Sequence, residues 1–213
     1  MAKIRNIIIV GAGGFGREVA SWIEHLGADA GVTIAGFLDD TKEPCAALSA
    51  DYPYPVLGSI GSYEPQPGEG VVVAIGDPRA KLRIAYSLAE KGARFYNVIH
   101  PTAVVARTAM LGQGVILCPF SLVSASATVA NYVTVNAYGG VGHDVVIGEG
   151  STICAHVDLT GGVQLDEGVF VGSNASILPG VDVGAFAVIG AGTVVLRRVE
   201  AGTTMYAPLS RKL

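Results

Sequence analysis

His143 and Asp144 are the residues of this 213-residue chain whose types and positions most favour catalysis. They follow Val141 and Gly142 in a regularly repeating part of the sequence. A neutral imidazole can remove a proton from a reacting group, and a nearby carboxylate can fix its tautomer and stabilise its charged form. Neighbouring residues of a regular strand face opposite ways, so the two side chains can meet only where the chain turns. Because a lone histidine is often structural, a non-catalytic role for His143 is the alternative.

Two glycine-bearing turns are candidate ligand-binding elements. Residues 11–16 read GAGGFG between an apolar strand and a helix, so backbone N–H groups and the positive helix end can hold a diphosphate. The carboxylates of Asp39 and Asp40, after the next expected strand, can accept hydrogen bonds from a ribose or a nucleobase. The second turn, at residues 74–77, lies between another expected strand and helix. A purely structural turn, and for Asp77 a helix cap, are the alternatives. The candidate substrate-binding residues here are Gly13, Gly14, Phe15, Asp39, Asp40, Gly76 and Asp77.

The first hundred residues alternate between expected strands and helices. The hydrophobic pattern predicts strands at 6–10, 33–38, 70–75 and 94–99, and helices at 14–26 and 78–91. The connection 42–68 contains five prolines and is expected to be irregular. These elements predict a small Rossmann-like α/β domain with a parallel sheet over residues 1–98. It is too short for the second mononucleotide half that bound NAD or FAD would need.

From residue 99 the sequence repeats every six residues. An aliphatic residue occupies each sixth position from Ile99 to Val195, and the residue four places later is mostly small. A period of six fits neither a helix nor a single strand, so it predicts a parallel β-helix over residues 99–213. Three hexads make one coil, and the coils are expected to stack roughly 4.8 Å apart. The glycine that often follows the aliphatic residue, as at Gly112 and Gly142, is expected to need a positive φ.

Composition excludes several classes of function. The net charge of −4 and the 14 dispersed basic residues argue against binding to nucleic acid or an anionic membrane. No stretch of about 20 apolar residues predicts a membrane span. The three cysteines are unpatterned, and Cys118 and Cys154 are expected on one face two coils apart, beyond disulfide reach. Reduced thiols predict a cytoplasmic protein.

Five sequence strings together carry a resemblance to a known family. They are VGAGGFG at 10–16, FLDD at 37–40, AIGD at 74–77, IHPTA at 99–103 and VGHDVVIG at 141–148. The chain resembles, over almost its whole length, the bacterial hexapeptide-repeat sugar acetyltransferases. That family includes nucleotide-linked 4-amino-sugar N-acetyltransferases and sialic acid O-acetyltransferases.

The resemblance implies a fold, a reaction and a set of site residues. It implies a left-handed β-helix, a homotrimer, acetyl-CoA lying between neighbouring helices, and a nucleotide held by the N-terminal domain. The implied reaction is acetylation of the 4-amino group of a nucleotide-linked amino-deoxysugar in bacterial surface glycan or lipopolysaccharide biosynthesis, without a metal. His143 would be the general base, helped by Asp144, and Asn136 could contact the sugar. Thr152, where some relatives have a second histidine, and the small residues Gly161, Gly172, Ser173 and Gly190 are the candidate acetyl-CoA contacts, although these glycines could equally be turn residues.

Three other functions remain open at this stage. The same fold and base could acetylate a hydroxyl of sialic acid or another sugar. A zinc lyase of the γ-carbonic anhydrase kind also uses trimeric hexapeptide helices, but three suitably placed histidines are missing. A non-catalytic binding module, in which His143 is incidental, is the third alternative.

Overall fold

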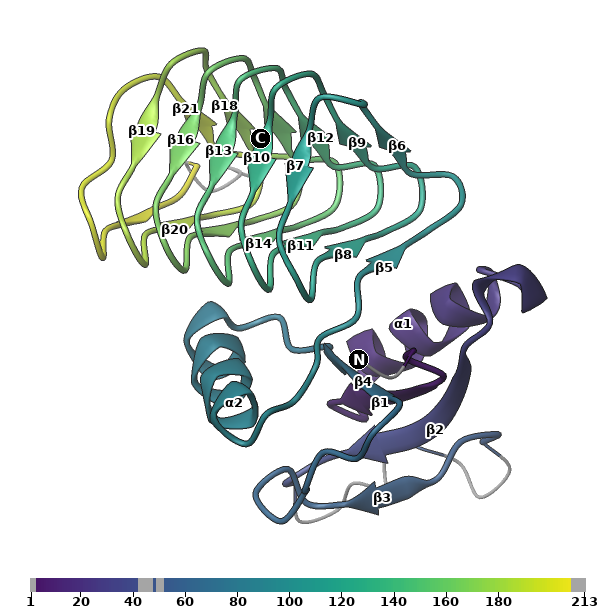
Figure 1. Ribbon diagram of the computed structural model, residues 1–213. Coiled ribbons are helices and arrows are strands. Elements are labelled where there is room, and N and C mark those ends of the chain that lie inside the picture. The colour runs from purple at the N-terminus through teal and green to yellow at the C-terminus, as the bar shows by residue number, and fades with distance from the viewer. Residues whose placement is uncertain (1–2, 42–47, 49–51, 208–213) are drawn as a thin grey trace, which may run out of the picture.

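The computed structural model describes residues 3–41, 48 and 52–207, which form an α/β domain followed by a three-sided β-helix (Figure 1). The α/β domain contains one parallel sheet in the order β3-β2-β1-β4. Its strands are β1 (Asn6–Val10), β2 (Thr33–Leu38), β3 (Val56–Gly58) and β4 (Glu69–Val73). The small parallel sheet predicted from the sequence is therefore confirmed.

Two parts of this domain differ from the sequence-based expectation. Strand β3 forms within the proline-rich connection, at the outer side of the sheet, where an edge strand tolerates nearby prolines. The strand expected at 94–99 is interrupted, because Phe95 makes a single bridge with Val71 before the chain leaves the sheet for the β-helix. Residues 42–47 and 49–51, and with them Cys45, lie outside the described residues.

Helices cover both faces of the sheet. Helix α1 (Gly14–Glu24) shares a core with Ile7 and Ile9, and α2 (Pro78–Glu90) packs with Ile8 and Val10. A short 3-10 helix, η1 (Ala28–Ala30), follows α1. Because successive residues of β1 point to opposite faces and both faces are buried, its sequence is continuously apolar.

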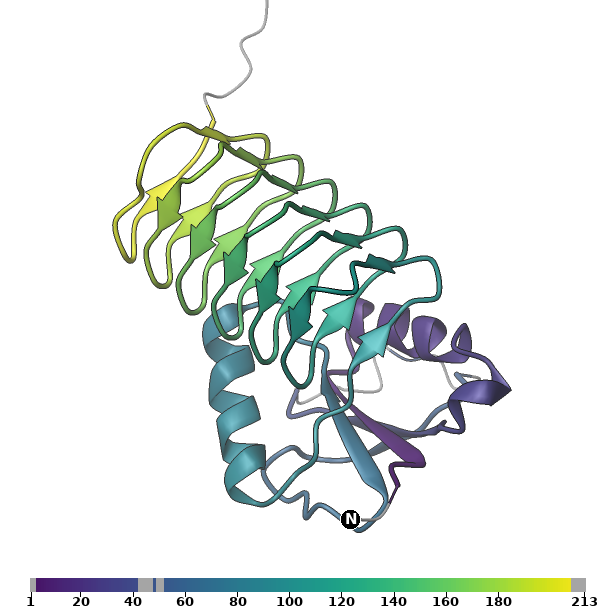
Figure 2. The same cartoon turned by 45° about the horizontal axis from the view of Figure 1, so that its top comes forward.

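The β-helix has three faces, each a parallel sheet of two-residue strands (Figures 1 and 2). The docked face lies against the α/β domain and holds β5 (Val98–Ile99), β8 (Ile116–Leu117), β11 (Thr134–Val135), β14 (Thr152–Ile153), β17 (Phe170–Val171), β20 (Val188–Ile189) and β22 (Thr204–Met205). The second face holds β6 (Val104–Val105), β9 (Leu122–Val123), β12 (Gly140–Val141), β15 (Asp158–Leu159), β18 (Ser176–Ile177) and β21 (Val194–Val195). The third face holds β7 (Met110–Leu111), β10 (Thr128–Val129), β13 (Val146–Ile147), β16 (Gln164–Leu165) and β19 (Asp182–Val183).

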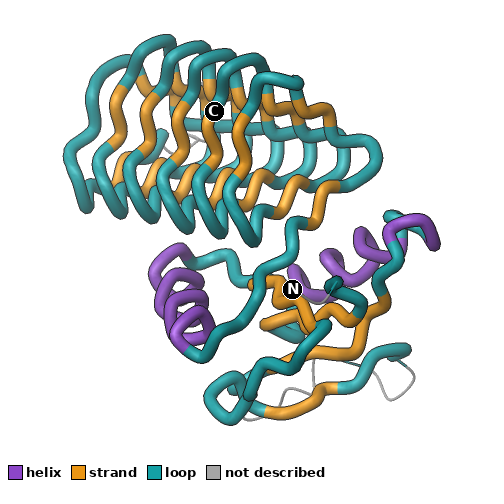
Figure 3. The backbone as a smooth tube through the Cα atoms, in the orientation of Figure 1, coloured by secondary structure: helices purple, strands orange, loops and turns teal. Residues whose placement is uncertain are grey.

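The turns between these faces stack into three long edges (Figure 3). Edge I follows the docked-face strands, edge II the second-face strands and edge III the third-face strands. Partners in neighbouring coils are three hexads apart in the sequence, as for Val129 and Ile147, and the sixth-position aliphatics fill the interior. The predicted β-helix is confirmed. Its last coil is shorter, because Val183 bridges to Val199 and Ile189 pairs with Met205.

The expected positive φ falls on a different position of each hexad. It belongs to the third residue after the aliphatic one, which is Asp144 (φ 60°) on the coil of His143. The glycine immediately after the aliphatic residue serves another purpose. A Cβ on Gly142 would lie 2.7 Å from the carbonyl oxygen of Leu159, and one on Gly172 would lie 2.6 Å from the backbone nitrogen of Ala191. Glycine there lets the stacked coils approach, which corrects the sequence-based interpretation.

The α/β domain and the β-helix share two apolar cores. In the first, α1 and β1 pack with Ile116 and Cys118 of the docked face; in the second, α2 packs with Tyr132. The α/β domain is thus held on one side of the triangular β-helix, as Figure 2 shows. In the part of the chain that is described, no helix has the length and apolar character needed to cross a bilayer.

Candidate active site

His143 and Asp144 meet at edge II, between β12 and β13. Asp144 Oδ2 lies 2.7 Å from His143 Nδ1, and both side chains are mostly exposed, at 70% and 65%. The left-handed backbone of Asp144 turns its carboxylate beside the preceding residue, which an extended strand would not allow. When Nδ1–H donates to this carboxylate, Nε2 has a free lone pair. The pair can therefore accept a proton from a group that approaches edge II.

Gly161 lies one coil above His143 and leaves room for the imidazole. A Cβ at this position would collide with Nε2 and Cε1 of His143 and would lie 3.1 Å from Cδ2. The backbone supports the same arrangement, because Gly162 N donates to the carbonyl oxygen of His143 at 2.9 Å. Gly161 was predicted as an acetyl-CoA contact; its structural environment identifies it first as the neighbour that accommodates the His143 ring.

A hollow of about 420 Å³ lies at the carboxyl ends of β1, β2 and β4. We call it the glycine-loop hollow. Ligands of parallel α/β sheets bind at these strand ends, which is where the sequence analysis expected the nucleotide. It is lined by Gly11, Gly13, Asp39, Asp40, Thr41, Ile60, Ala74, Ile75, Arg83 and Ile84.

The glycines near this hollow divide into two kinds. Gly11 has a φ of 101° and a Cβ there would lie 2.9 Å from the carbonyl oxygen of Ala74, while a Cβ on Gly16 would collide with Gly11. These two residues shape the turn. In contrast, a Cβ on Gly13 or Gly76 would meet nothing within 4 Å. Their small size is not required by packing within the described residues, so it leaves backbone open to an approaching ligand.

The two predicted carboxylates also hold the loops around the hollow. Asp39 Oδ2 accepts from Ala12 N at 2.7 Å, and its Oδ1 accepts from Thr41 N at 2.8 Å. Burial alone would raise the pKa of Asp39, but the hydrogen bonds from Thr41 and Ala12 lower it below its usual value. Asp40 Oδ1 accepts from Ile60 N at 2.7 Å. Asp39 thus fixes the glycine loop, and Asp40 is the more exposed of the two.

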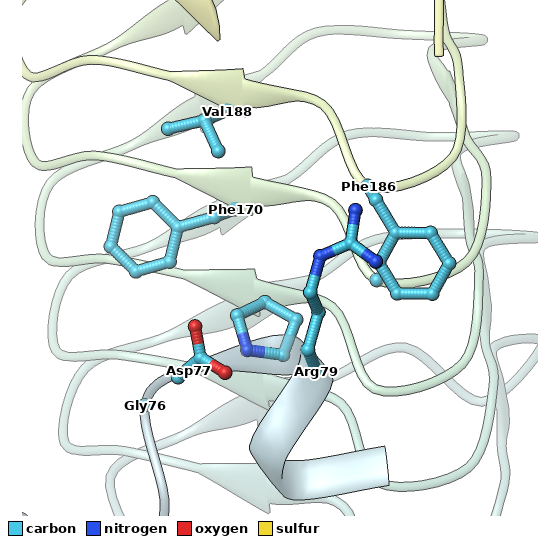
Figure 4. A pocket seen from close by; sticks show the side chains of 8 residues that line it. Gly76, Asp77, Arg79, Phe170, Phe186 and Val188 are labelled. Carbon is cyan, nitrogen blue, oxygen red and sulfur yellow. The ribbon is translucent and has the colours of Figure 1, made fainter. Parts of the chain in front are cut away.

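A second hollow, of about 500 Å³, lies between the start of α2 and the β-helix (Figure 4). We call it the interdomain hollow. Phe170 and Val188 reach it from the docked face, and the Arg79 guanidinium lies 4.1 Å from the centre of the Phe186 ring. Gly76 and Asp77 form its other wall, and Asp77 Oδ1 also caps α2 through Ala80 N at 2.7 Å. The two hollows therefore meet at the segment 74–77, whose consecutive residues line one and then the other.

The remaining predicted residues occupy other places. Asn136, Gly172, Ser173 and Gly190 lie along edge I, directly after β11, β17 and β20, and Asn136 Oδ1 accepts from Ala137 N at 2.7 Å. Thr152 is buried on the docked face and hydrogen-bonds to the α/β domain. Phe15 packs edge-on against Trp22, 6.0 Å between ring centres, rather than lining either hollow. Gly14 starts α1 beside Gly13.

The other histidines have structural contacts. His25 Nδ1 lies 3.0 Å from His100 Nε2, which joins the end of α1 to the first coil. His156 stacks on Tyr138 at 4.8 Å, and Tyr138 stacks on Phe120 along edge I. No group of three histidine, cysteine, aspartate or glutamate side chains suited to a metal occurs among the described residues.

The site also contains residues that the sequence analysis did not select. Arg79, Phe170, Phe186 and Val188 line the interdomain hollow, and Lys81 is completely buried beside it. Phe170 and Val188 occupy the first positions of their strands, where other coils carry both apolar residues (Val98, Ile116) and threonines (Thr134, Thr152), so no departure from a pattern marked them in the sequence. No signal in the sequence marked Lys81, because its hydrogen-bond partners belong to the β-helix and lie far along the chain.

Within one chain, the two hollows and the His143–Asp144 pair lie on different sides of the β-helix. Both hollows border the α/β domain, which packs on the docked face. His143 lies on edge II. This edge joins the second and third faces and is therefore opposite the docked face of the triangle (Figures 1 and 2). The imidazole of His143 therefore lies on the other side of the β-helix from both hollows.

Comparison with known proteins finds a matching family model in each of the two domains. Residues 6–88 match the family model of the PglD N-terminal domain, and residues 162–197 match the bacterial transferase hexapeptide family, a model of six repeats. The N-terminal part of the chain is thus similar to the PglD N-terminal domain, and part of its β-helix is similar to bacterial hexapeptide transferases.

Solved structures extend this likeness to nearly the whole chain. The acetyltransferase domain of PglB from Neisseria gonorrhoeae FA1090, in complex with acetyl coenzyme A, is 27% identical with a TM-score of 0.85, covering 96% of this chain and 97% of that one. PerB from Caulobacter crescentus, in complex with CoA and GDP-perosamine, is 28% identical with a TM-score of 0.84, covering 97% and 96%.

Curated relatives give shorter matches. The GDP-perosamine N-acetyltransferase of Escherichia coli O157:H7 is 32% identical over 77 residues, which are 36% of this chain and 35% of that protein. The UDP-N-acetylbacillosamine N-acetyltransferase of Bacillus subtilis (strain 168) is 26% identical over 54% of this chain. The chain spans 51% of that enzyme's length, so these sequence matches cover about half of each relative or less.

Proposed function

We propose that this protein transfers the acetyl group of acetyl-CoA to the 4-amino group of a nucleotide-linked amino-deoxysugar. The observation that carries the proposal is the His143–Asp144 pair, whose 2.7 Å contact leaves Nε2 of an exposed imidazole free to act as a base. The likeness to PglB and PerB, whose structures hold acetyl-CoA, or CoA with GDP-perosamine, supports the same reaction.

The transfer needs one tetrahedral intermediate and no acetyl-enzyme. The sugar amine attacks the thioester carbonyl carbon while His143 Nε2 takes the amine proton, and Asp144 stabilises the resulting imidazolium. Collapse of the intermediate breaks the C–S bond, and the imidazolium returns the proton to the departing CoA sulfur. Holding both substrates together lowers the barrier by orientation, and a backbone N–H at a corner of the β-helix is our candidate for the oxyanion donor.

The two adjoining hollows suit the two parts of the acceptor. The glycine-loop hollow offers open backbone at Gly13, the start of α1 and the Arg83 side chain to a nucleoside diphosphate. The interdomain hollow offers an apolar wall of Phe170 and Val188, with Asp77 opposite, to the deoxysugar. The segment 74–77 would then lie beside the sugar–phosphate linkage.

We propose that the active unit is a homotrimer, in which His143 of one chain faces the hollows of its neighbour. This follows from the separation of the two regions within one chain, because a ring of identical head-to-tail contacts supplies each hollow with a base. Exposed apolar residues on the second and third faces support contact with another copy. They include Val104, Met110, Leu122 and Val146, which are 60%, 63%, 45% and 38% exposed.

Edge I is the proposed acetyl-CoA strip. Gly172, Ser173 and Gly190 lie on successive coils of this edge, and the proposed pantetheine arm would lie beside their backbone. Asn136, two coils earlier than Gly172, stands on the same edge and is the proposed sugar contact there. We place the reaction in the cytoplasm, because Cys118 and Cys154 are free thiols that suit a reducing compartment.

A thiol-release assay tests the proposal. The protein is given acetyl-CoA with a panel of UDP-, dTDP- and GDP-linked 4-amino-6-deoxysugars, and with sialic acid and free amino sugars as comparison acceptors. We expect turnover with a nucleotide-linked amine and loss of that turnover when the nucleotide is removed. Turnover confined to a hydroxyl acceptor would replace the proposal by O-acetylation, and binding of neither acetyl-CoA nor any nucleotide sugar would favour a non-catalytic protein.

A further inference from the structure

Lys81 places an ammonium group in the buried contact between α2 and the docked face. The side chain has no exposed surface. Its Nζ donates to Thr152 Oγ1 at 2.8 Å and to Thr134 Oγ1 and the Ser151 carbonyl oxygen at 3.2 Å each. Three acceptors thus match the three hydrogens that the group has in its charged form. All of them come from the β-helix, so one side chain of the α/β domain is fixed to two neighbouring coils.

Thr152 continues this contact back to the α/β domain. Its hydroxyl lies 2.8 Å from the Gly76 carbonyl oxygen, which can only accept. Because a hydroxyl has a single hydrogen, the Thr152 proton goes to Gly76, and its lone pair receives the hydrogen from Lys81. The ammonium therefore fixes the direction in which the threonine donates. We call these three residues the Lys81–Thr152–Gly76 relay.

The relay ends at the boundary between the two hollows. Gly76 lines the interdomain hollow, while its neighbour Ile75 lines the glycine-loop hollow. The next residue, Asp77, faces the interdomain hollow and begins the cap of α2. A shift of the Gly76 carbonyl would therefore change the position of this turn relative to both hollows.

An apolar residue would satisfy the packing of this helix without a buried charge. Leu82, Ala85 and Leu88 bury the apolar side of α2, and a buried charge requires complete hydrogen bonding to be tolerated. Burial lowers the pKa of Lys81 to about 7, which nearby Cys154, Asp77 and Cys118 partly oppose. The lysine is thus an unfavourable way to pack α2, but an effective way to fix a hydroxyl.

We propose that Lys81 and Thr152 are positioning residues that fix the Gly76–Asp77 turn for the acceptor sugar. This inference rests on the proposed function, because it assigns the turn to the acceptor. Neither side chain takes part in the chemistry. Their effect is to hold the wall of the interdomain hollow at one distance from the docked face.

The matched pair Thr152→Val and Thr152→Ser tests the relay. Valine keeps the shape but removes the hydroxyl, whereas serine keeps the hydroxyl. Thr134→Val is the control, because it removes a Lys81 acceptor and leaves the bond to Gly76 intact. We expect Thr152→Val to raise the KM for the nucleotide sugar about fivefold to tenfold, with the KM for acetyl-CoA and the melting temperature nearly unchanged. Serine at 152 and valine at 134 should each stay within about twofold of the wild type.

Hydrogen exchange gives a second measurement that needs no turnover. In the free protein, Thr152→Val should speed exchange of the amides in residues 75–80, and Thr152→Ser should not. An unchanged acceptor KM together with unchanged exchange would overturn the inference. The inference would also be overturned if Thr152→Val and Thr134→Val raised both KM values equally and lowered the melting temperature equally. That pattern would indicate a general loosening of the contact between α2 and the docked face. If the wild type acetylates no nucleotide-linked amine, the proposed function fails, and the exchange result still decides whether the relay holds the turn.

Discussion

The glycine-loop hollow and edge II carry the two halves of the proposed chemistry, and they are built differently. The hollow is concave and lies at the ends of three parallel strands, with backbone left open at Gly13. Edge II is convex, and its His143 is 70% exposed. One region can enclose a ligand and the other can only approach one. The contrast supports our proposal that each chain binds one acceptor and presents its base to an acceptor held by a neighbouring chain.

Replacing His143 gives the largest expected effect and tests the base side of the comparison. His143→Ala should reduce kcat about a thousandfold or more, since general base catalysis contributes that much. The exposed position predicts unchanged circular dichroism and unchanged KM for the nucleotide sugar. Near-normal turnover in the thiol-release assay would contradict the assignment of the base.

Mixing two inactive variants tests whether the two regions act across chains. His143→Ala keeps the hollow, and Gly13→Val fills it without disturbing the loop, because nothing lies within 4 Å of a Cβ there. In randomly assembled trimers of equal mixture, about a quarter of the sites combine an intact base with an intact hollow. Co-expressed variants should recover about that fraction of wild-type activity, more than a hundredfold above either parent. Activity no higher than the parental mean would place both halves in one chain.

Removing the charge of Asp144 sharpens the account of edge II. In Asp144→Asn, the amide can donate to Nδ1, which moves the imidazole hydrogen to Nε2 and blocks proton removal. We expect kcat to fall about tenfold to a hundredfold with little change in either KM. Asp29→Asn is the matched control, an exposed carboxylate in η1 of the α/β domain, and it should leave kcat unchanged.

Gly161→Ala should have a smaller effect that depends only on the space around His143. The added methyl group would displace the imidazole from the place it occupies beside Gly161. A displaced base predicts a fall in kcat of about tenfold, with the melting temperature and acetyl-CoA affinity retained. A fall confined to the affinity for acetyl-CoA would instead identify Gly161 as a cofactor contact.

The buried lysine predicts an effect of another kind, on the pH dependence of stability rather than on kcat. The pKa of Lys81 is lowered by burial from 10.5 to about 7. Between these two values the unfolded chain binds the extra proton, so the group adds stability as pH rises through this range. In urea unfolding, the wild type should gain stability between about pH 7 and pH 10 relative to Lys81→Met. Parallel pH profiles of the two proteins would show that Lys81 does not titrate in this way.

The β-helix and the strand-end site could be predicted from the sequence because local chemistry specifies them. The unbroken sixth-position aliphatics require a coil of three hexads, and GAGGFG after an apolar strand requires a turn into a helix. The place of positive φ was missed because the corner depends on stacking between coils. The reason for glycine at 142 is the carbonyl of Leu159 in the next coil, and no pattern within one hexad contains that contact.

The interdomain hollow was beyond prediction because it depends on docking. Phe186 and Arg79 belong to different domains and meet only when α2 lies on the docked face. Phe15 shows the opposite case. The loop pattern suggested a ligand contact, but an aromatic ring two helical turns before Trp22 lies on the same side of α1 and packs against it. Thr152 was assigned from its spacing to His143 in the sequence, and its actual neighbours come from the other domain.

The repeated corners of the β-helix make the site modular along its axis. Successive coils present a left-handed residue at edge II, as at Ser126 and Asp144, and the coils are roughly 4.8 Å apart. A histidine–aspartate pair moved by one coil would keep its local geometry and change only its distance from the α/β domain. The position of the base along the β-helix can therefore change in steps of one coil. A related protein could act on a longer or shorter acceptor through such a shift, without a change of fold.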